Sequence, residues 1–196
     1  MRLALVIRST YAENTIVPER DLFLDNATQF VERLEANDAA FDVVTLDATR
    51  ELPETLEALL RSHAGKLESL LVHYSGYIAV KADRGPALLL DGNRLRAFPL
   101  SRLRAAIEDG AQQALVIVDG LAIVDQDQAP DVVAKSVGAA IASQEGKISA
   151  MVGVESEPPV SRRGSLRLTD LFLLSLDYLA TKSPGKLVSD NALYQT

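Results

Sequence analysis

Short apolar runs alternate with amphipathic stretches along the whole chain. Five runs have the length of strands buried on both faces of a sheet, and apolar residues recur at helical spacing in the stretches between them. This alternation predicts a doubly wound, mostly parallel α/β sheet with helices on its faces. The predicted strands are 3–7, 41–46, 67–78, 114–119 and 147–154, the predicted helices are 19–37, 52–63, 99–110, 132–142 and 166–179, and a small hairpin is expected from 77–80 and 87–90.

The run 67–78 is the strand around which the other elements are arranged. It is apolar until Ser75-Gly76, where the glycine indicates that the strand ends. The run 114–119 ends in the same way, at Asp119-Gly120. Because ligands bind at the carboxyl ends of the strands in open α/β sheets, any functional site is expected where these two strands end.

Composition excludes several classes of function. With 27 acidic and 20 basic residues the net charge is −7, which disfavours nucleic acid as a partner. The chain has no cysteine, so thiolate catalysis and thiolate metal sites are excluded. No run approaches the roughly 18 apolar residues of a membrane span, and the first apolar run is too short for a signal peptide, so we expect a cytoplasmic protein that does not contact membranes. Glycine-rich phosphate-binding motifs and metal-ligand spacing are absent from the sequence, and we expect no cofactor.

The order of the elements and the two strand ends resemble the caspase-like family, closest to bacterial metacaspase-like domains. In that family the third strand ends in Ser-Gly-His-Gly, whose histidine is the catalytic base, whereas Ser75-Gly76-Tyr77 stands here. The family's fourth strand ends in Asp-x-Cys, whose cysteine is the nucleophile, whereas Asp119-Gly120-Leu121 stands here. Arg163-Gly164-Ser165 and the tail at 188–194 resemble the start of the family's last long helix and the segment that follows it.

The resemblance implies a caspase-like three-layer α/β/α sandwich. Its parallel strands, numbered along the chain, would have the order 2-1-3-4-5. The tail at 187–196 fits either a sixth, antiparallel edge strand or the start of another helix. No repeat or linker divides the chain, so we expect a single domain over residues 1–196, either a protein by itself or one piece of a longer polypeptide.

The two replaced residues direct the functional prediction. A tyrosine titrates near ~10 and is a poor base at neutral pH, and a leucine has no nucleophilic atom, so Tyr77 and Leu121 offer no route to an acyl-enzyme. We therefore expect a catalytically inactive caspase-like domain that acts as a protein-binding, regulatory module in a bacterial multidomain or operon-encoded system. Tyr77 and Leu121 should lie at the ends of neighbouring strands and pack together in the former catalytic cleft.

Three other interpretations follow from the same residues. The first is a hydrolase that uses Ser75 as nucleophile with His73 and Asp119, since His73 and Ser75 share one face of a strand. The second is binding of basic peptides, because the family's acidic residue at the position of Asp119 lines a pocket for arginine or lysine. The third is scaffolding through an exposed edge strand, with an oligomeric state that the sequence leaves open. The acidic rim of the second interpretation would comprise Asp119, Asp125, Asp127, Glu155 and Glu157, which also fit ordinary solvated loop charges.

Overall fold

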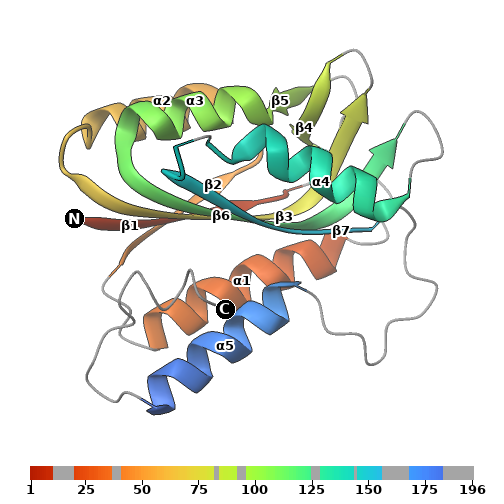
Figure 1. The fold of residues 1–196 in the computed structure, drawn as a ribbon. Coiled ribbons are helices and arrows are strands. Elements are labelled where there is room, and N and C mark those ends of the chain that lie inside the picture. The colour runs from red at the N-terminus through yellow and green to blue at the C-terminus, as the bar shows by residue number, and fades with distance from the viewer. Residues whose placement is uncertain are drawn as a thin grey trace.

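In the computed structural model, seven strands form one mostly parallel sheet between two layers of helices (Figure 1). The structure describes residues 1–10, 20–36, 41–81, 84–91, 96–124, 129–143, 145–155 and 168–182. The elements in chain order are β1 (Arg2–Arg8), α1 (Arg20–Ala36), β2 (Asp42–Asp47), α2 (Leu52–Ser62), β3 (Leu67–Lys81), β4 (Gly85–Leu89), β5 (Ala97–Pro99), α3 (Leu100–Gly110), β6 (Ala111–Val124), α4 (Pro130–Ile141), β7 (Ile148–Glu155) and α5 (Leu168–Lys182).

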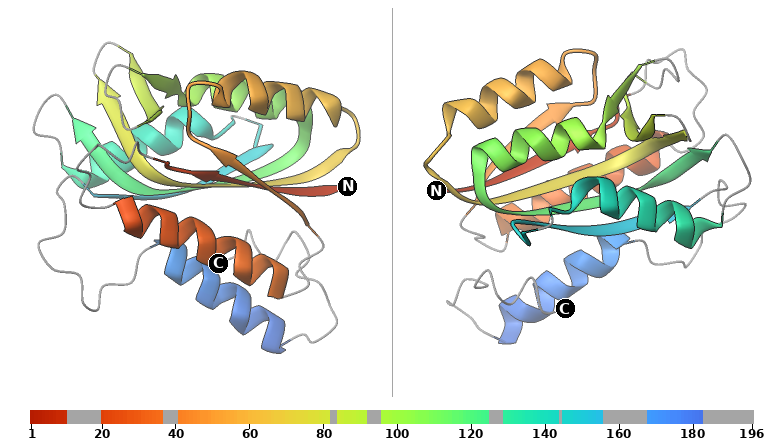
Figure 2. Two further views of the ribbon diagram at one scale, coloured as in Figure 1. Left: turned by 180° about the vertical axis from the view of Figure 1, so that it is seen from behind. Right: turned by 45° about the horizontal axis from the view of Figure 1, so that its top comes forward.

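The five parallel strands have the order β2-β1-β3-β6-β7. Counted over these five strands alone, this is the expected order 2-1-3-4-5, which is therefore confirmed. Helices α2, α3 and α4 cover one face of the sheet, and α1 and α5 cover the other (Figures 1 and 2). The prediction of a three-layer α/β/α sandwich is confirmed.

Most side chains on both faces of the central strand are apolar, because helices cover both faces. Successive side chains of β3 point to opposite faces. Val72 and Tyr74 belong to the core beneath α2, α3 and α4, whereas Leu71 belongs to the core shared with α1 and α5. The same alternation places residues 73, 75 and 77 on the α1–α5 face.

The two central strands are longer than the sequence indicates. β3 has 15 residues and β6 has 14, so neither strand stops at Ser75-Gly76 or at Asp119. Gly76 and Gly120 lie opposite each other in the parallel register. A Cβ atom on Gly120 would come within 2.1 Å of the Gly76 carbonyl oxygen. The predicted strand ends are wrong, because these glycines mark a close approach of two backbones rather than the exit of a chain.

Beyond Ser75, β3 exchanges one neighbouring strand for another. The β1–β3 pairing ends at Arg8 and Ser75, and residues 78–81 of β3 then pair antiparallel with β4. On its other side β3 stays paired with β6 as far as Val80. The expected hairpin is confirmed, and β5 adds a third strand to it. These hydrogen bonds on both sides sustain β3 past the glycine.

Some predictions fall outside the described residues. These are the sixth strand in the tail and the two segments Arg163-Gly164-Ser165 and 188–194 that resemble the caspase-like family. In the described part of the chain, no helix is both long and apolar enough to cross a membrane.

Candidate functional site

Tyr77 and Leu121 lie opposite each other on the paired strands β3 and β6. Phe23 of α1 covers them, and the three side chains form a small apolar cluster. The ring centroids of Phe23 and Tyr77 are 5.3 Å apart with the rings inclined by 75°, an edge-to-face contact. Leu121 is only 4% exposed. The predicted neighbourhood of Tyr77 and Leu121 is confirmed, although both residues lie within their strands rather than at strand ends.

His73 lies fully buried on the same face of β3. Its ring stacks on Phe30 of α1, with centroids 4.1 Å apart and planes 12° apart, and Phe30 stacks in turn on Phe172 of α5. The His73 Nε2 atom lies 3.1 Å from Thr169 Oγ1, whereas Nδ1 is buried without a hydrogen-bond partner. Burial lowers the pKa of His73 from 6.5 to about 3, because the charged imidazolium would lose its hydration. The ring is therefore neutral at physiological pH.

Asp119 of β6 holds the first turn of α5. Its Oδ2 atom accepts hydrogen bonds from the Thr169 backbone N–H at 3.0 Å and from the Thr169 hydroxyl at 2.7 Å. A carboxylate in this place satisfies one of the free N–H groups of the helix and complements the helix dipole. The Thr169 hydroxyl donates its one proton to Asp119, so it accepts from His73, and this assigns the imidazole proton to Nε2. The chain His73–Thr169–Asp119 thus links β3 and β6 to α5.

Ser75 has partners of its own. Its Oγ accepts a hydrogen bond from Asn26 Nδ2 at 3.1 Å, and its carbonyl oxygen accepts one from Ser9 Oγ at 2.6 Å. All three side chains are buried. Ser75 is fully buried, and the His73 ring bonds Thr169 instead of Ser75. The hydrogen bonds of these residues therefore do not join Ser75, His73 and Asp119 into a hydrolytic set, and hydrolysis by Ser75 stays a prediction.

Asp119 is not part of an open acidic surface. It is 6% exposed, and its Oδ2 atom is used by Thr169 beneath α5. This carboxylate caps a helix in the structure, and its binding to a basic peptide stays a prediction. Glu155, at the end of β7, is exposed. The other members of the acidic rim, Asp125, Asp127 and Glu157, lie outside the described residues.

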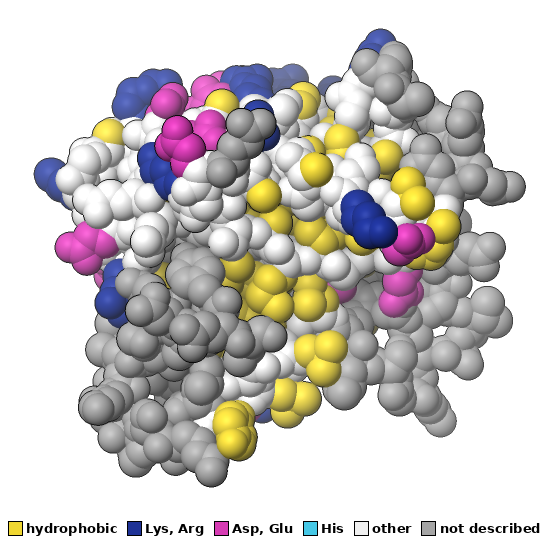
Figure 3. Space-filling view, in the orientation of Figure 1, with side chains coloured by type: hydrophobic (Ala, Val, Ile, Leu, Met, Phe, Trp, Pro, Cys, Tyr) yellow, Lys and Arg dark blue, Asp and Glu magenta, His cyan; other side chains and the backbone are white. Residues whose placement is uncertain are grey.

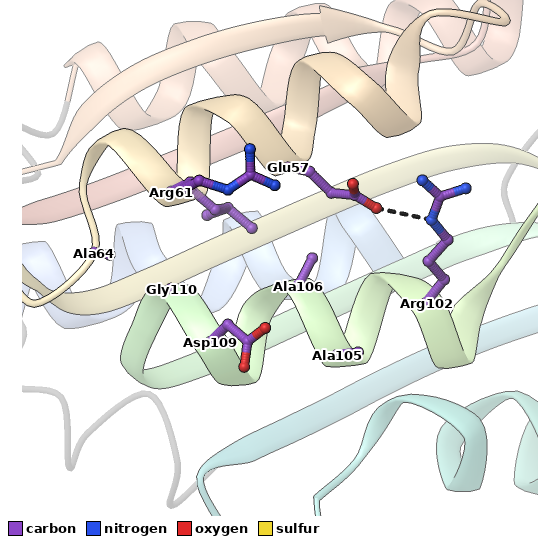
Figure 4. Close-up of a pocket in the computed structure, with 9 residues that line it drawn as sticks. Glu57, Arg61, Ala64, Arg102, Ala105, Ala106, Asp109 and Gly110 are labelled. Carbon is purple, nitrogen blue, oxygen red and sulfur yellow. Dashed lines mark hydrogen bonds and ion pairs between the residues drawn. The ribbon is translucent and has the colours of Figure 1, made fainter.

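A groove of about 430 Å³ lies between α2 and α3, on the other face of the sheet (Figure 4). Arg102 Nε donates to Glu57 Oε1 at 2.7 Å across the two helices, and this ion pair lowers the pKa of Glu57 and raises that of Arg102. The helices approach closely because Gly110 has no side chain: a Cβ there would lie 3.0 Å from Leu60 Cβ. The lining is made of Glu57, Leu60, Arg61, Ala64, Arg102, Ala105, Ala106, Asp109 and Gly110. These groups suit weak polar contacts, and they include no nucleophile paired with a base.

The roles of Phe23, Asn26 and Thr169 were not predicted from the sequence, and neither was the groove. Phe23 fits the apolar pattern of one helix, and Asn26 is one of its polar residues. Neither pattern indicates which strand residues these side chains contact. Thr169 is 50 residues away from Asp119 along the chain. The one local indication for Thr169 is the Thr-Asp pair at the start of an apolar helix, which is typical of a helix N-terminus. This pattern does not indicate which residue accepts hydrogen bonds from the first N–H groups of the helix.

Comparison with known proteins does not add a family. No protein-family model matches the chain, and no curated protein matches it. Among solved structures, the chain is similar to the crystal structure of protein GSU0716 from Geobacter sulfurreducens, with 17% sequence identity and a TM-score of 0.44. The similarity covers 71% of this chain and 61% of that chain, which is less than two thirds of its length. In the part of the chain that the structure describes, no group of three or more histidine, aspartate or glutamate side chains is arranged to hold a metal ion.

Proposed function

We propose that this protein is a non-catalytic, caspase-like domain that binds a protein partner and regulates it. The observation that carries the proposal is the cluster of Tyr77, Leu121 and Phe23. The resemblance assigns the positions of Tyr77 and Leu121 to a catalytic histidine and cysteine. A phenol and an isobutyl group stand there side by side, and a phenylalanine from α1 covers them.

The filled site favours stability over chemistry. Burying a leucine side chain stabilises a fold by roughly 1.5–3 kcal/mol, whereas an exposed catalytic dyad contributes little to stability. The polar residues nearby also serve the fold: Asp119 caps α5, and His73 of β3 is neutral and buried beneath α1 and α5. A domain that keeps this architecture without a reactive pair of residues can still bind other molecules through its surface. Binding is therefore the function that we propose.

Turnover of peptides tests the non-catalytic half of the proposal. Purified protein is incubated with fluorogenic peptides that carry arginine, lysine or aspartate before the reporter, and a fluorophosphonate probe is added in a parallel sample. We expect no turnover above buffer and no labelling that distinguishes the parent from Ser75→Ala. Turnover that is retained through purification and lost in Ser75→Ala or Asp119→Asn, with folding verified by circular dichroism, would overturn it.

Co-expression tests the binding half. The domain is co-expressed with each product of the genes next to its own and passed through gel filtration. We expect a stable complex with at least one of them, which persists in the Tyr77→Phe variant because the apolar cluster is not a reaction centre. If every product elutes separately from the domain, the operon-encoded partner that we propose does not exist.

A further inference from the structure

Helix α5 is apolar on two sides. Phe172, Leu173 and Leu176 are buried against the sheet and α1. On its outer side Leu171, Leu174 and Tyr178 are 49%, 53% and 60% exposed. Their spacing of three and four residues puts them in a single row along the helix, which we call the α5 stripe. Figure 3 shows hydrophobic side chains reaching the surface in the lower part of the view, where α5 lies.

An apolar row of this kind is unusual on a surface helix. A helix packed on a sheet normally has one apolar and one polar side, and a helix that is apolar all round is normally covered. Contiguous exposed apolar surface marks a place where another molecule binds. The α5 stripe is therefore a candidate docking surface, separate from the contact of α5 with the sheet.

The neighbouring helix supplies charge beside the stripe. Asp21, Asp25 and Glu32 of α1 are exposed, and the spacing of four and seven residues places them along its outer side. We call them the α1 carboxylates. In the described residues no ion pair neutralises them, whereas the Arg33–Asp177 ion pair at 2.9 Å joins α1 to α5. The two helices lie side by side beneath the sheet (Figures 1 and 2), so the α1 carboxylates and the α5 stripe belong to neighbouring helices on the same side of the sheet.

We propose that the α5 stripe and the α1 carboxylates together bind an amphipathic helix of a partner protein, with an apolar row flanked by lysine or arginine. This inference rests on the proposed function as a binding domain and names the partner's chemistry. Apolar anchors three and four residues apart are how an amphipathic helix is recognised, and a basic flank would face the three carboxylates. A second copy of this chain fits less well, because its own α1 carboxylates and its net charge of −7 would repel those of the first copy.

Synthetic helices test the proposal directly. The probe is a fluorescein-labelled peptide of about 18 residues, five helical turns, in which leucines form one face and lysines the other. The comparison peptides are a scrambled sequence of the same composition, which spreads the leucines around the helix, and an amphipathic peptide with glutamate in place of lysine. Fluorescence anisotropy with the intact domain should give an affinity for the leucine–lysine helix about tenfold above that for either comparison peptide.

Variants locate the surface. Leu171→Ser/Leu174→Ser/Tyr178→Ser should weaken binding of the leucine–lysine helix about tenfold or more, since it removes the anchors. Its control is Val132→Ser, because Val132 on α4 is equally exposed at 50%. Asp25→Asn/Glu32→Gln should weaken binding about threefold and reduce its dependence on salt. Its control is Glu54→Gln/Glu145→Gln, which changes the charge equally and removes no α1 carboxylate. Circular dichroism verifies that each variant is folded.

Several results would overturn the inference. One is equal binding of the scrambled peptide, and another is a triple variant that binds as tightly as the parent. A parent that sediments as a dimer, and a triple variant that sediments as a monomer, would assign the stripe to a second copy. If the leucine–lysine helix binds only after truncation at residue 182, the cover is the chain's own tail. None of these results concerns peptide turnover, which alone decides whether the domain is an enzyme.

Discussion

The carboxylate of Asp119 accepts two hydrogen bonds from Thr169, one from the backbone N–H and one from the hydroxyl. Asp119 lies within the central strand β6, whereas Thr169 lies in the first turn of the last helix, α5. The contact is buried and carries a charge on the acceptor, which makes it stronger than a bond between neutral groups. It joins the sheet to the helix that carries the α5 stripe.

Replacing Asp119 should therefore loosen α5. In Asp119→Ala two buried donors of Thr169 lose their acceptor, and we expect a loss of about 2–3 kcal/mol in the free energy of unfolding. Asp119→Asn keeps an acceptor oxygen and should cost less. The control is Asp131→Ala, because Asp131 opens α4 in an exposed ion pair with Lys135 and should cost no more than about 0.5 kcal/mol. Urea denaturation measures all three, and equal losses for the two alanine variants would contradict the capping role.

His73 should make stability depend on pH. Its pKa is about 3 in the folded protein and 6.5 for a freely hydrated histidine in the unfolded chain, so unfolding takes up a proton at any pH between these values. Its contribution to stability is fully present above pH 6.5 and is lost as the pH falls toward 3. Inside that window the loss is about 1.4 kcal/mol per pH unit.

The comparison with His73→Gln isolates this effect from the titration of carboxylates. The difference in free energy of unfolding between parent and variant should fall by roughly 2–3 kcal/mol between about pH 6 and about pH 4. Urea denaturation at several pH values measures it, and a nuclear magnetic resonance titration of the His73 ring checks its protonation. A difference that stays constant over this range would show that the imidazole is already charged or is reached by water.

The apolar cluster should resist conversion into a dyad. Tyr77→His/Leu121→Cys places both catalytic residue types of the resembled family at their positions, but the thiol would take over a site that is 4% exposed. We expect a loss of about 1–3 kcal/mol from the lost packing against Phe23, and no peptide turnover, because the groups around the pair are not arranged for catalysis. Leu121→Met conserves volume and should cost less than about 1.5 kcal/mol. Turnover by the double variant above that of the parent would contradict this expectation.

Two glycine substitutions should have opposite effects. Gly120→Ala would place a methyl group 2.1 Å from the Gly76 carbonyl oxygen, a backbone atom that cannot turn aside, and we expect a loss of at least about 2 kcal/mol. Gly138→Ala lies in α4, where the nearest atom would be Val152 Cγ2 at 3.8 Å, and should stabilise the protein by about 0.5–1 kcal/mol. Thermal and urea denaturation measure both. A tolerated Gly120→Ala would show that the central strands can separate at this point.

The hydrophobic pattern by itself determined the sequence of elements and the class of fold. The five parallel strands, the five helices and the hairpin after β3 were all predicted near their observed positions. This works because burial on two faces selects continuous apolar runs, and burial on one side selects helical spacing, so each short segment carries the signal of its own environment. The pairing of Tyr77 with Leu121 came from the family resemblance, and the register confirms their neighbourhood.

Only the tertiary structure decided where the central strands end and what the polar residues do. Gly76 locally indicates a strand end, but hydrogen bonds from β4 and β6 carry β3 beyond it. The sequence around Asp119 predicts a solvent-exposed carboxylate, but Thr169 of α5 donates hydrogen bonds to that carboxylate. A local sequence pattern predicts which side chains are buried. The hydrogen-bond partner of a buried donor or acceptor depends on how segments that are distant along the chain pack together.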